Sequence, residues 1–534
     1  MDVLEERAPR GFGRRCRESL MRRPVFAAIG LTLSSAIAAV PAPARIDVTQ
    51  GIVRATPGKD ADDDAKAINA CLAALPASGG TLYFPAGGYL LKSRIVLRNR
   101  ANVTFAGEGG TSVLRTPADT GKYRHGDFPL IEATASGGLA FRDLAFAGPG
   151  KAYGGDSVQS PAIYLREGSG QAQIVNCVFR DLNSGIRIEN GSDCRVTGNL
   201  FLGAIVQDGV QLMRRSYRNV VSGNVFRYSD SARSGMGIRV SGYPNEPAMY
   251  NSISGNTISN AKDEGIVAEF AEGNTVSANT VSDCSYGIQL YDARNFTVTG
   301  NVVARCRRVG IGLFANSRGR RITGNVITGN SVRDCGSEPL SHAITVSSPP
   351  EGSADSNIIS GNYVSGGNTN GIDITARFCL IQGNYVQASG KMGICLANAA
   401  DCLVSGNYIL QPGTHGIYGG TRSTISGNHI IAGTNPNADA AGLWEKGFEN
   451  PNLAGNTIVG FRHDIVGAQP IRRDSTAPAV PPVPGLARMP LGAVEILSGA
   501  ADPKGTDGAP VGSLYLKTDG TLFQKTAAQA WTRK

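Results

Sequence analysis

Short apolar runs alternate with small turn residues along most of this chain. Gly-Asn pairs recur, each usually after Ser or Thr and before an aliphatic or aromatic residue, and Ala278-Asn279 fills one gap in the series. A second marker, Gly followed by an aliphatic residue as in Gly237-Ile238, falls about midway between pairs. The intervals between asparagines are mostly 21 to 25 residues, with longer ones of 32, 37 and 28. The asparagines of the series are Asn199, Asn224, Asn256, Asn301, Asn325, Asn362, Asn384, Asn407, Asn428 and Asn456.

This periodicity predicts an all-β solenoid of parallel strands. Two strand starts per repeat, with no helical periodicity between them, indicate short strands joined by tight turns, which bury their apolar face only by stacking coil on coil. Asn at a fixed turn position tolerates the left-handed conformation, and stacked Asn side chains bond along the axis. Leucine-rich and helical repeats are excluded, because their leucine spacing and helical segments are missing.

A short helix is predicted before the coils. Asp62, Asp63 and Asp64 are suited to cap its start. Apolar residues then follow at helical spacing, and Gly79-Gly80 leads into a strand that runs to Pro85. The stripe consists of Ile68, Cys71, Leu72 and Leu75.

The repeat resembles the NosD and carbohydrate-binding/sugar-hydrolase type of right-handed parallel β-helix over residues 45–466. It is also similar to a family of twin-arginine-exported repeat proteins whose activity is not established. The entry segment, with its run GGTLYFPAG, resembles that of pectate-lyase-like and tailspike β-helices. That resemblance implies a helix that caps the open N-terminal end of the solenoid, where strand edges would otherwise be unpaired.

The chain divides into five parts by composition. Residues 1–44, with paired arginines, an apolar stretch and Ala42-Pro43-Ala44, are typical of an export signal, by either the twin-arginine or the general route. Residues 45–110 form the cap and first strands, 111–466 the β-helix repeats and 467–490 a proline-rich linker. Residues 491–534 contain a hairpin around Asp519-Gly520 and resemble a small module at the ends of phage tail fibres, which suggests a homotrimer.

Nine of the ten cysteines follow the export signal, and an odd number argues against a fully paired disulfide framework. Cys284, Cys306 and Cys335 fall at one place in successive coils, and Cys379 and Cys402 share another column. We therefore expect stacked, buried thiols, although the coil spacing also permits a disulfide.

Residues that face outward from one sheet carry the candidate chemistry. Alternate strand residues point to opposite faces, so positions at a fixed distance after each Gly marker share one face. Two positions after the markers lie Arg187, Gln211, Arg239, Val267, Gln289, Gly312, Asp373, Cys395 and Tyr418, and the strand led by His342 occupies the long interval.

Two clusters follow from this alignment. The first contains Arg239, Glu264, Glu269, Gln289, Tyr291 and Asp292, and its carboxylates, Arg and Tyr are suited to bind a uronate and move its C5 proton, with Tyr or Arg as the base. The second contains His342, Thr345, Asn370, Asp373 and Arg377, where a His beside an Asp is suited to act as an oriented base. Arg187 and Gln211 extend the substrate-binding face. Insertions at 243–250 and 336–353 bracket Glu264 to Phe314, which favours the first cluster, and they are expected to wall a groove.

These features favour an exported, periplasmic or secreted protein that acts on an acidic polysaccharide as a lyase, hydrolase or epimerase. The alternative is a non-catalytic envelope or surface protein that binds glycan or has a structural role, because solenoid faces carry polar residues for solubility alone. The Asn-Thr-Asp and Asp-Pro-His signatures of β-helical hydrolases and mannuronan epimerases are missing. No P-loop, dinucleotide fingerprint, cofactor or metal motif occurs, and no nucleic-acid partner or stable membrane span after processing is expected.

Overall fold

A computed structural model describes most of the chain from residue 44 onward. The described residues are 44–51, 53–59, 62–117, 128–149, 160–229, 235–315, 321–339, 341–348, 354–434, 437–445, 449 and 452–467, with five strands between 487 and 533. The predicted export signal lies outside them, apart from Ala44. In this part of the chain, no helix has the length and apolarity that a membrane crossing requires.

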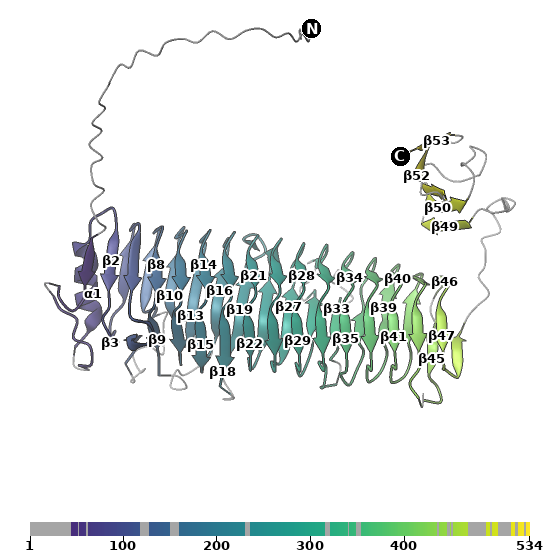
Figure 1. Cartoon of the computed structure of the whole chain (residues 1–534), viewed down its shortest axis with the longest axis horizontal. Coiled ribbons are helices and arrows are strands. Elements are labelled where there is room, and N and C mark those ends of the chain that lie inside the picture. Colours follow the sequence, from purple (N-terminus) through teal and green to yellow (C-terminus); the bar gives the residue numbers. More distant parts are fainter. Residues whose placement is uncertain are drawn as a thin grey trace, which may run out of the picture. The chain divides into compact units, whose positions relative to one another are not determined.

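Three parallel sheets wind around one core as a right-handed β-helix, with one strand of each sheet per coil (Figure 1). The chain passes from sheet A to sheet B to sheet C and then returns to sheet A of the next coil. Every described pairing within these sheets is between parallel strands of neighbouring coils, as the repeat predicts. The all-β solenoid prediction is therefore confirmed.

Sheet A has 16 strands, and sheets B and C have 15 each. Sheet A consists of β1 (Arg45–Asp47), β2 (Gly80–Tyr83), β5 (Val103–Ala106), β8 (Ala140–Arg142), β11 (Gln173–Val175), β14 (Arg195–Thr197), β17 (Val220–Ser222), β21 (Ser252–Ser254), β25 (Thr275–Ser277), β28 (Thr297–Thr299), β31 (Val326–Thr328), β34 (Ile358–Ser360), β37 (Leu380–Gln382), β40 (Leu403–Ser405), β43 (Thr424–Ser426) and β46 (Asn452–Ala454). Sheet B consists of β3 (Gly87–Leu90), β6 (Ser112–Arg115), β9 (Ala145–Ala147), β12 (Val178–Arg180), β15 (Leu200–Gly203), β18 (Val225–Tyr228), β22 (Thr257–Ser259), β26 (Thr280–Ser282), β29 (Val302–Ala304), β32 (Ser331–Arg333), β35 (Tyr363–Ser365), β38 (Tyr385–Gln387), β41 (Tyr408–Leu410), β44 (His429–Ile431) and β47 (Thr457–Val459). Sheet C consists of β4 (Ile95–Arg98), β7 (Ile131–Thr134), β10 (Pro161–Arg166), β13 (Ser184–Glu189), β16 (Asp208–Met213), β19 (Met236–Ser241), β23 (Glu264–Glu269), β27 (Tyr286–Tyr291), β30 (Ile311–Phe314), β33 (Ile344–Ser347), β36 (Ile372–Ile374), β39 (Ile394–Ala400), β42 (Ile417–Thr421), β45 (Ala441–Trp444) and β48 (His463–Val466).

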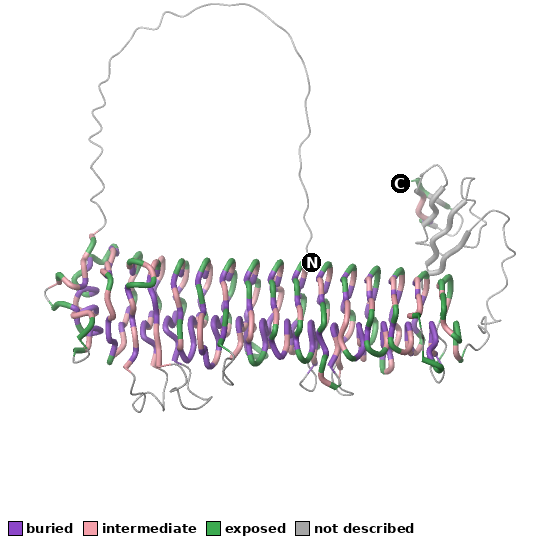
Figure 2. Tube along the Cα trace, turned by 60° about the horizontal axis from the view of Figure 1, so that its bottom comes forward, coloured by how far each residue is buried: buried purple, intermediate pink, exposed green. Residues whose placement is uncertain are grey.

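Buried positions recur from coil to coil (Figure 2), and apolar side chains fill the interior at these positions. Under sheet B, Phe146, Phe179, Phe201 and Phe226 stack with ring centroids 5.0, 4.8 and 4.4 Å apart. The nine described cysteines are all buried and free, which confirms buried thiols for the five cysteines that were predicted to stack. Parallel in-register strands bring identical positions one above another, so the same side-chain type fills the same space in each coil.

Buried asparagines form a ladder at the turn between sheets A and B. The amide of Asn301 donates to Oδ1 of Asn330 at 2.9 Å, and Asn330 in turn donates to Asn362 at 3.0 Å. The ladder therefore passes through Asn330, and the prediction that Asn325 belongs to it was wrong. Asn325 bonds Asn357 at 2.9 Å in a second ladder, at the turn between sheets C and A. Both residues follow a Gly, so the Gly-Asn pair alone does not distinguish the two turns.

The left-handed residue of the turn between sheets A and B is the one before the asparagine. Gly223 and Gly300 both have φ of 63°, whereas the ladder asparagines lie outside this region. The expectation that Asn itself adopts the left-handed conformation was therefore wrong: glycine supplies the turn, and Asn supplies the buried amide. Ala278, which replaces the glycine before Asn279, has φ of 54° and carries the strain of a Cβ in this conformation.

Replacing Ala278 with Gly is expected to raise the free energy of unfolding by up to about 1 kcal/mol, because relief of the left-handed strain exceeds the added chain entropy. Thermal unfolding followed by circular dichroism measures this change. The matched control is Ala304→Gly. Ala304 lies in the extended strand β29, so this variant should have a lower free energy of unfolding. Equal losses in both variants would contradict the strain at Ala278.

A helix and a separate small sheet lie at the two ends of the described chain. Helix α1 (Asp64–Ala74) begins at Asp63, whose side chain accepts a bond from the Ala65 amide at 3.3 Å, and it buries Ile68, Cys71 and Leu72. Its role as a cap of the open end stays a prediction. A 3-10 turn (Gly109–Thr111) and the strand pair β20 (Ala248–Met249) and β24 (Ala271–Glu272) lie along the β-helix.

The C-terminal sheet contains β49 (Ala487–Leu491), β50 (Val494–Gly499), β51 (Leu514–Lys517), β52 (Leu522–Ala527) and β53 (Ala530–Arg533). Strands β51 and β52 pair antiparallel. The predicted Asp519-Gly520 turn lies outside the described residues, so the hairpin module also stays a prediction.

Candidate functional site on sheet C

The strand pairings of sheet C bring the residues two positions after the Gly markers into one register column. The strand pairings align Arg187 with Gln211 and Arg239, and continue through Gln289 and Gly312. The column then passes through Thr345, Asp373, Cys395, Tyr418 and Trp444. The sequence alignment of the Gly markers thus placed these residues in the correct order. Sheet C also has the longest strands, with six residues in each strand from β10 to β27.

Arg239 forms the centre of a carboxylate cluster. Its Nε donates to Oε2 of Glu269 at 3.0 Å, its second guanidinium nitrogen contacts the same oxygen, and Ser241 donates to that oxygen at 3.2 Å. Burial acts to lower the pKa of Arg239, but the charges of Asp208 and Glu269 outweigh it and raise this pKa. Arg239 therefore stays protonated and holds Glu269 in position.

Glu264 is a largely buried carboxyl group in this cluster. Its side chain is 6% exposed, and its Oε2 is buried without a hydrogen-bond partner among the described residues. Burial, followed by the charge of Asp263, raises the pKa of Glu264 to about 7. Tyr291 donates a hydrogen bond to Glu264 Oε1 at 3.4 Å. A carboxyl group with a pKa near neutral exists in both protonation states under physiological conditions.

Tyr291 connects Glu264 to a pocket of about 410 Å³ over β27 and β30. Burial, with the charge of Glu264, raises the pKa of Tyr291, so its hydroxyl stays protonated. The Tyr291 and Phe314 rings stack with centroids 5.4 Å apart. The pocket is lined by Tyr286, Tyr291, Arg308, Val309, Phe314, Glu338, Pro339 and Ser341.

The insertion before β33 forms one wall of this pocket. Glu338, Pro339 and Ser341 come from it, and Arg308 donates to Glu338 at 2.8 Å. Strand β33 (Ile344–Ser347) lies within the predicted insertion 336–353, so that segment is not one continuous insertion. Gly312 lies beside the pocket, and a Cβ there would come within 2.3 Å of Gln289 Oε1 and 2.4 Å of the Phe314 ring. Gln289 itself is fully buried, so it supports the pocket from below.

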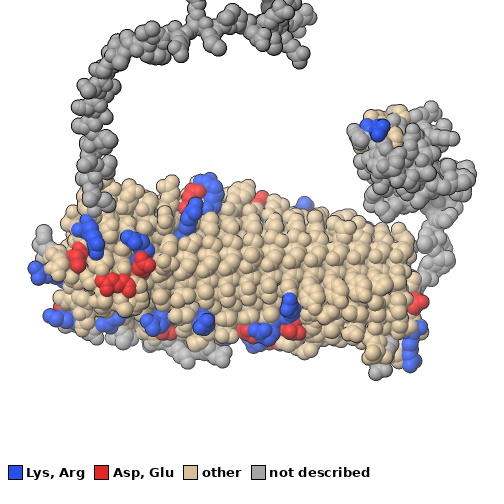
Figure 3. All heavy atoms as spheres, viewed as in Figure 1, with Lys and Arg blue, Asp and Glu red and all other residues tan. Residues whose placement is uncertain are grey.

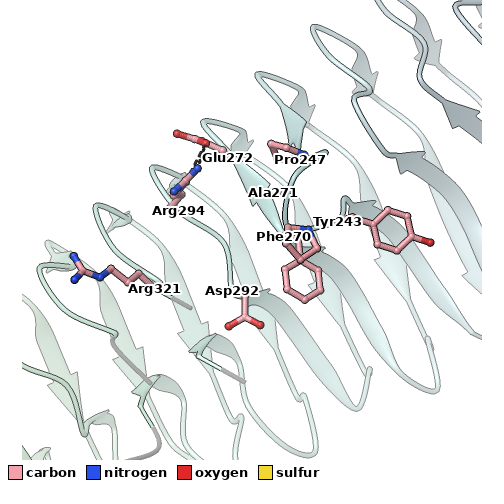
Figure 4. Close-up of a pocket in the computed structure, with 9 residues that line it drawn as sticks. Tyr243, Pro247, Phe270, Ala271, Glu272, Asp292, Arg294 and Arg321 are labelled. Carbon is pink, nitrogen blue, oxygen red and sulfur yellow. Dashed lines mark hydrogen bonds and ion pairs between the residues drawn. The ribbon is translucent and has the colours of Figure 1, made fainter. Parts of the chain in front are cut away.

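A second, smaller pocket of about 180 Å³ lies at the other edge of sheet C (Figure 4). Tyr243 and Pro247 of the 243–250 insertion line it, together with Asp292 from the end of β27. Glu272 and Arg294 pair across it at 2.8 Å. Both predicted insertions therefore wall a pocket next to the first cluster, and Asp292 belongs to the smaller one.

Sequence reasoning missed Asp208. It is fully buried at the start of β16, one of its oxygens contacts Gln211, and its Oδ1 lacks a hydrogen-bond partner among the described residues. Burial raises the pKa of Asp208. Asp208 occupies the position directly before a Gly marker, as Glu264 does, so scanning that position in every coil would have found it.

The second predicted cluster lies beyond the larger pocket. His342 Nε2 is 3.7 Å from Asp373 Oδ2, and Asn370 donates to Asp373 Oδ1 at 2.7 Å. Burial lowers the pKa of His342 in spite of the opposing effect of Asp373. The side chain of Thr345 is buried in the same column. His342 and Asp373 are therefore brought together, with His342 neutral and adjacent to the pocket residue Ser341.

The two remaining arginines lie at the margins of the face. Arg187 pairs with Glu189 at 2.8 Å and stacks over Tyr164, with its guanidinium 5.0 Å from the ring centroid. Arg377 lies in the turn after β36 and pairs with Asp401 at 3.1 Å. Arg377 thus points to a neighbouring turn, whereas sequence reasoning placed it in the cluster of Asp373.

Several arginines of the described residues pair with carboxylates. On the face in Figure 3, acidic and basic side chains lie in small mixed groups, and much of the surface between them is uncharged. The net charge of +9 therefore does not form one broad basic field on this face. On sheet C, Arg187, Arg239 and Arg308 each contact a carboxylate.

Comparisons with known proteins place the chain among β-helices. Residues 152–368 match the family described as periplasmic copper-binding protein (NosD), and residues 351–472 match the right handed beta helix region family. No curated protein matches the sequence significantly.

Two solved structures share the fold. One is the tailspike protein of E. coli bacteriophage HK620 in complex with a pentasaccharide, with 13% identity, coverage of 75% of this chain and 76% of that one, and a TM-score of 0.55. The other is the Agl-KA catalytic domain, with 15% identity, coverage of 78% and 70%, and a TM-score of 0.53.

The copper in the first family's description has no matching ligand set among the described residues. No group of three or more His, Cys, Asp or Glu side chains there is placed to hold a metal ion. The nine described thiols, which copper would prefer, are all buried, and burial raises the pKa of Cys177 and Cys284 to about 12. The described part of the chain thus does not fit a copper site. The fold and the matches agree on one conclusion: this chain is a right-handed parallel β-helix, and its residues 152–368 are similar to the NosD family.

Proposed function

We propose that this protein cleaves a polysaccharide at the outer face of sheet C, with Glu264 as the general acid. One observation carries the proposal: a buried carboxyl group with a pKa of about 7 and a free oxygen lies beside Tyr291, which lines the aromatic pocket. A protonated carboxyl next to a bound sugar can donate its proton to the glycosidic oxygen, and a hydrophobic environment maintains that proton at neutral pH. The HK620 tailspike, which has this fold, binds a pentasaccharide.

The protonation states of the neighbouring groups favour hydrolysis over elimination or epimerisation. Tyr291 and Arg239 both have raised pKa values, so neither is suited to remove a C5 proton. A uronate lyase or epimerase also needs cations that are available to the substrate carboxylate, whereas Arg239 and Arg308 are engaged by Glu269 and Glu338. The acidic polysaccharide expected from the first cluster therefore stays a prediction, and the net charge of +9 is its remaining support.

The wider biological setting is part of the proposal. The export signal at residues 1–44 and the match to a periplasmic family support a periplasmic or secreted location. The tail-fibre resemblance supports a homotrimer built through the C-terminal module. Periplasmic fractionation and light scattering of the purified mature chain test these two points.

A panel of neutral and uronate polysaccharides separates the candidate activities. New reducing ends without absorbance from an unsaturated product indicate hydrolysis. Absorbance of that product indicates elimination, and a change of uronate composition without chain cleavage indicates epimerisation. Binding without any product would favour the non-catalytic glycan-binding protein and refute our proposal.

Replacing Tyr291 with Phe is expected to raise the pKa of Glu264 further, because the Tyr291 hydrogen bond stabilises the ionised carboxyl group. If protonated Glu264 is the active form, the alkaline limb of the activity profile should move to higher pH. The profile of kcat/KM against pH measures this shift. Tyr286→Phe, on the same strand, is the control and should leave the alkaline limb in place.

A further inference from the structure

Three aromatic side chains gather on sheet C toward its C-terminal end. The ring centroid of His415 lies 5.6 Å from that of Tyr418 and 4.7 Å from that of Trp444. Tyr418 and Trp444 are partners on neighbouring strands, with planes 19° apart and centroids 6.5 Å apart. All three side chains are partly exposed. We call this group the aromatic platform.

The platform also carries an oriented hydrogen-bond donor. His415 Nδ1 accepts a bond from the Ala441 amide at 3.2 Å. Burial lowers the pKa of His415, with Asp439 opposing, so the ring is neutral at neutral pH. A neutral imidazole that accepts at Nδ1 must carry its proton on Nε2, which can then donate to a hydroxyl group. Aromatic faces next to a hydroxyl-directed donor suit a sugar ring, which has both C–H and O–H groups.

The platform is aligned with the larger pocket along the solenoid axis. The column that contains Gly312 beside the pocket continues without a break through Thr345, Asp373, Cys395 and Tyr418 to Trp444. The five strand pairings from Gly312 to Trp444 place these two residues about 24 Å apart along the axis, at about 4.8 Å per coil. One sugar unit of an extended polysaccharide has a length similar to one coil, so a single chain can cover the pocket and the platform.

We infer that Trp444, Tyr418 and His415 form a distal subsite that binds a remote sugar of the polysaccharide proposed to be cleaved at Glu264. This inference rests on the proposed function for the identity of the ligand, but not on catalysis. The subsite makes binding depend on chain length: a disaccharide reaches only one of the two sites, and an octasaccharide spans both.

The fluorescence of Trp444 can be measured alone once Trp531, the only other tryptophan in the sequence, is replaced. The mature chain with Trp531→Phe and Glu264→Gln is titrated with disaccharides and octasaccharides prepared from dextrin, alginate and polygalacturonate. Octasaccharides of one series should change Trp444 fluorescence and bind more tightly than disaccharides. Trp444→Ala should weaken octasaccharide binding, measured by calorimetry, by roughly tenfold, and Trp444→Phe should restore most of it.

The outcomes separate this inference from the proposed function. Calorimetric binding of octasaccharides without any change in Trp444 fluorescence, and without an effect of Trp444→Ala, overturns the platform and leaves the proposed function intact. A length-dependent fluorescence change without turnover by the protein with Glu264 intact supports the platform and overturns the proposed catalysis. An unchanged melting temperature in Trp444→Ala shows that lost binding in this variant does not reflect lost folding.

Discussion

Replacing Glu264 with Gln is expected to lower the kcat for polysaccharide cleavage by about 10²–10⁴-fold, the range for loss of a general acid. The amide has almost the same shape and keeps a hydrogen-bond acceptor for Tyr291, but it cannot transfer a proton. In the unmodified protein, kcat/KM should fall as pH rises through about 7, where Glu264 loses its proton. Reducing-end assays across the pH range measure both effects.

A matched control is available on the surface of the same β-helix. Glu167 is an exposed carboxyl group that pairs with Arg166 at 3.0 Å, and Glu167→Gln should leave kcat unchanged. Turnover by Glu264→Gln at the level of this control would remove Glu264 from the mechanism.

Glu264→Gln has a second consequence, which concerns how the stability of the protein depends on pH. The pKa of Glu264 is raised from an ordinary value of 4.5 to about 7, so the folded chain binds its proton more tightly than the unfolded chain. The resulting stabilisation is complete below about pH 4.5 and is lost as pH rises through about 7. Thermal unfolding at pH 5 and pH 8 should therefore show a smaller difference for Glu264→Gln than for the unmodified protein.

Replacing Asn301 with Ala is expected to lower the free energy of unfolding by about 2–5 kcal/mol, because several buried polar groups lose their partners at once. The Asn301 amide nitrogen donates to the Val276 carbonyl at 2.9 Å and to Asn330 Oδ1 at 2.9 Å. Its Oδ1 accepts from the backbone amide of Asn279 at 2.9 Å and from the Asn279 side chain at 3.0 Å. Alanine removes the acceptor of the buried Asn279 backbone amide and one donor to the Val276 carbonyl, whereas Asn330 Oδ1 keeps the Asn301 backbone amide at 3.0 Å. Denaturant and thermal unfolding measure the loss.

Asn368→Ala provides the comparison for the ladder. Asn368 is exposed and its amide donates to the Ser337 carbonyl at 3.1 Å, so water can replace that bond. The expected change is within about 0.5 kcal/mol. A similar small change for Asn301→Ala would show that the ladder contributes little to stability, and that the apolar columns alone maintain the coils.

The contrast between Asn325 and Asn330 shows how far a repeat can be followed in the sequence. Each follows a glycine, and each forms a ladder, but at different corners of the coil. The chemical requirement is the same at both corners, namely a left-handed residue followed by a buried amide, so local pattern cannot tell them apart. Strand pairing decides the assignment, because Asn330 lies between β31 and β32 and Asn325 lies before β31.

The sequence by itself determined the solenoid, the order of its coils and the outward column from Arg187 to Tyr418, because period and alternation are local properties of the chain. Tertiary structure alone decided which outward groups are buried. Asp208 and Glu264 are enclosed by side chains from neighbouring coils, whereas Arg377 turns away to Asp401. Burial is set by residues far apart in sequence, and burial is what moves the pKa of Glu264 to about 7.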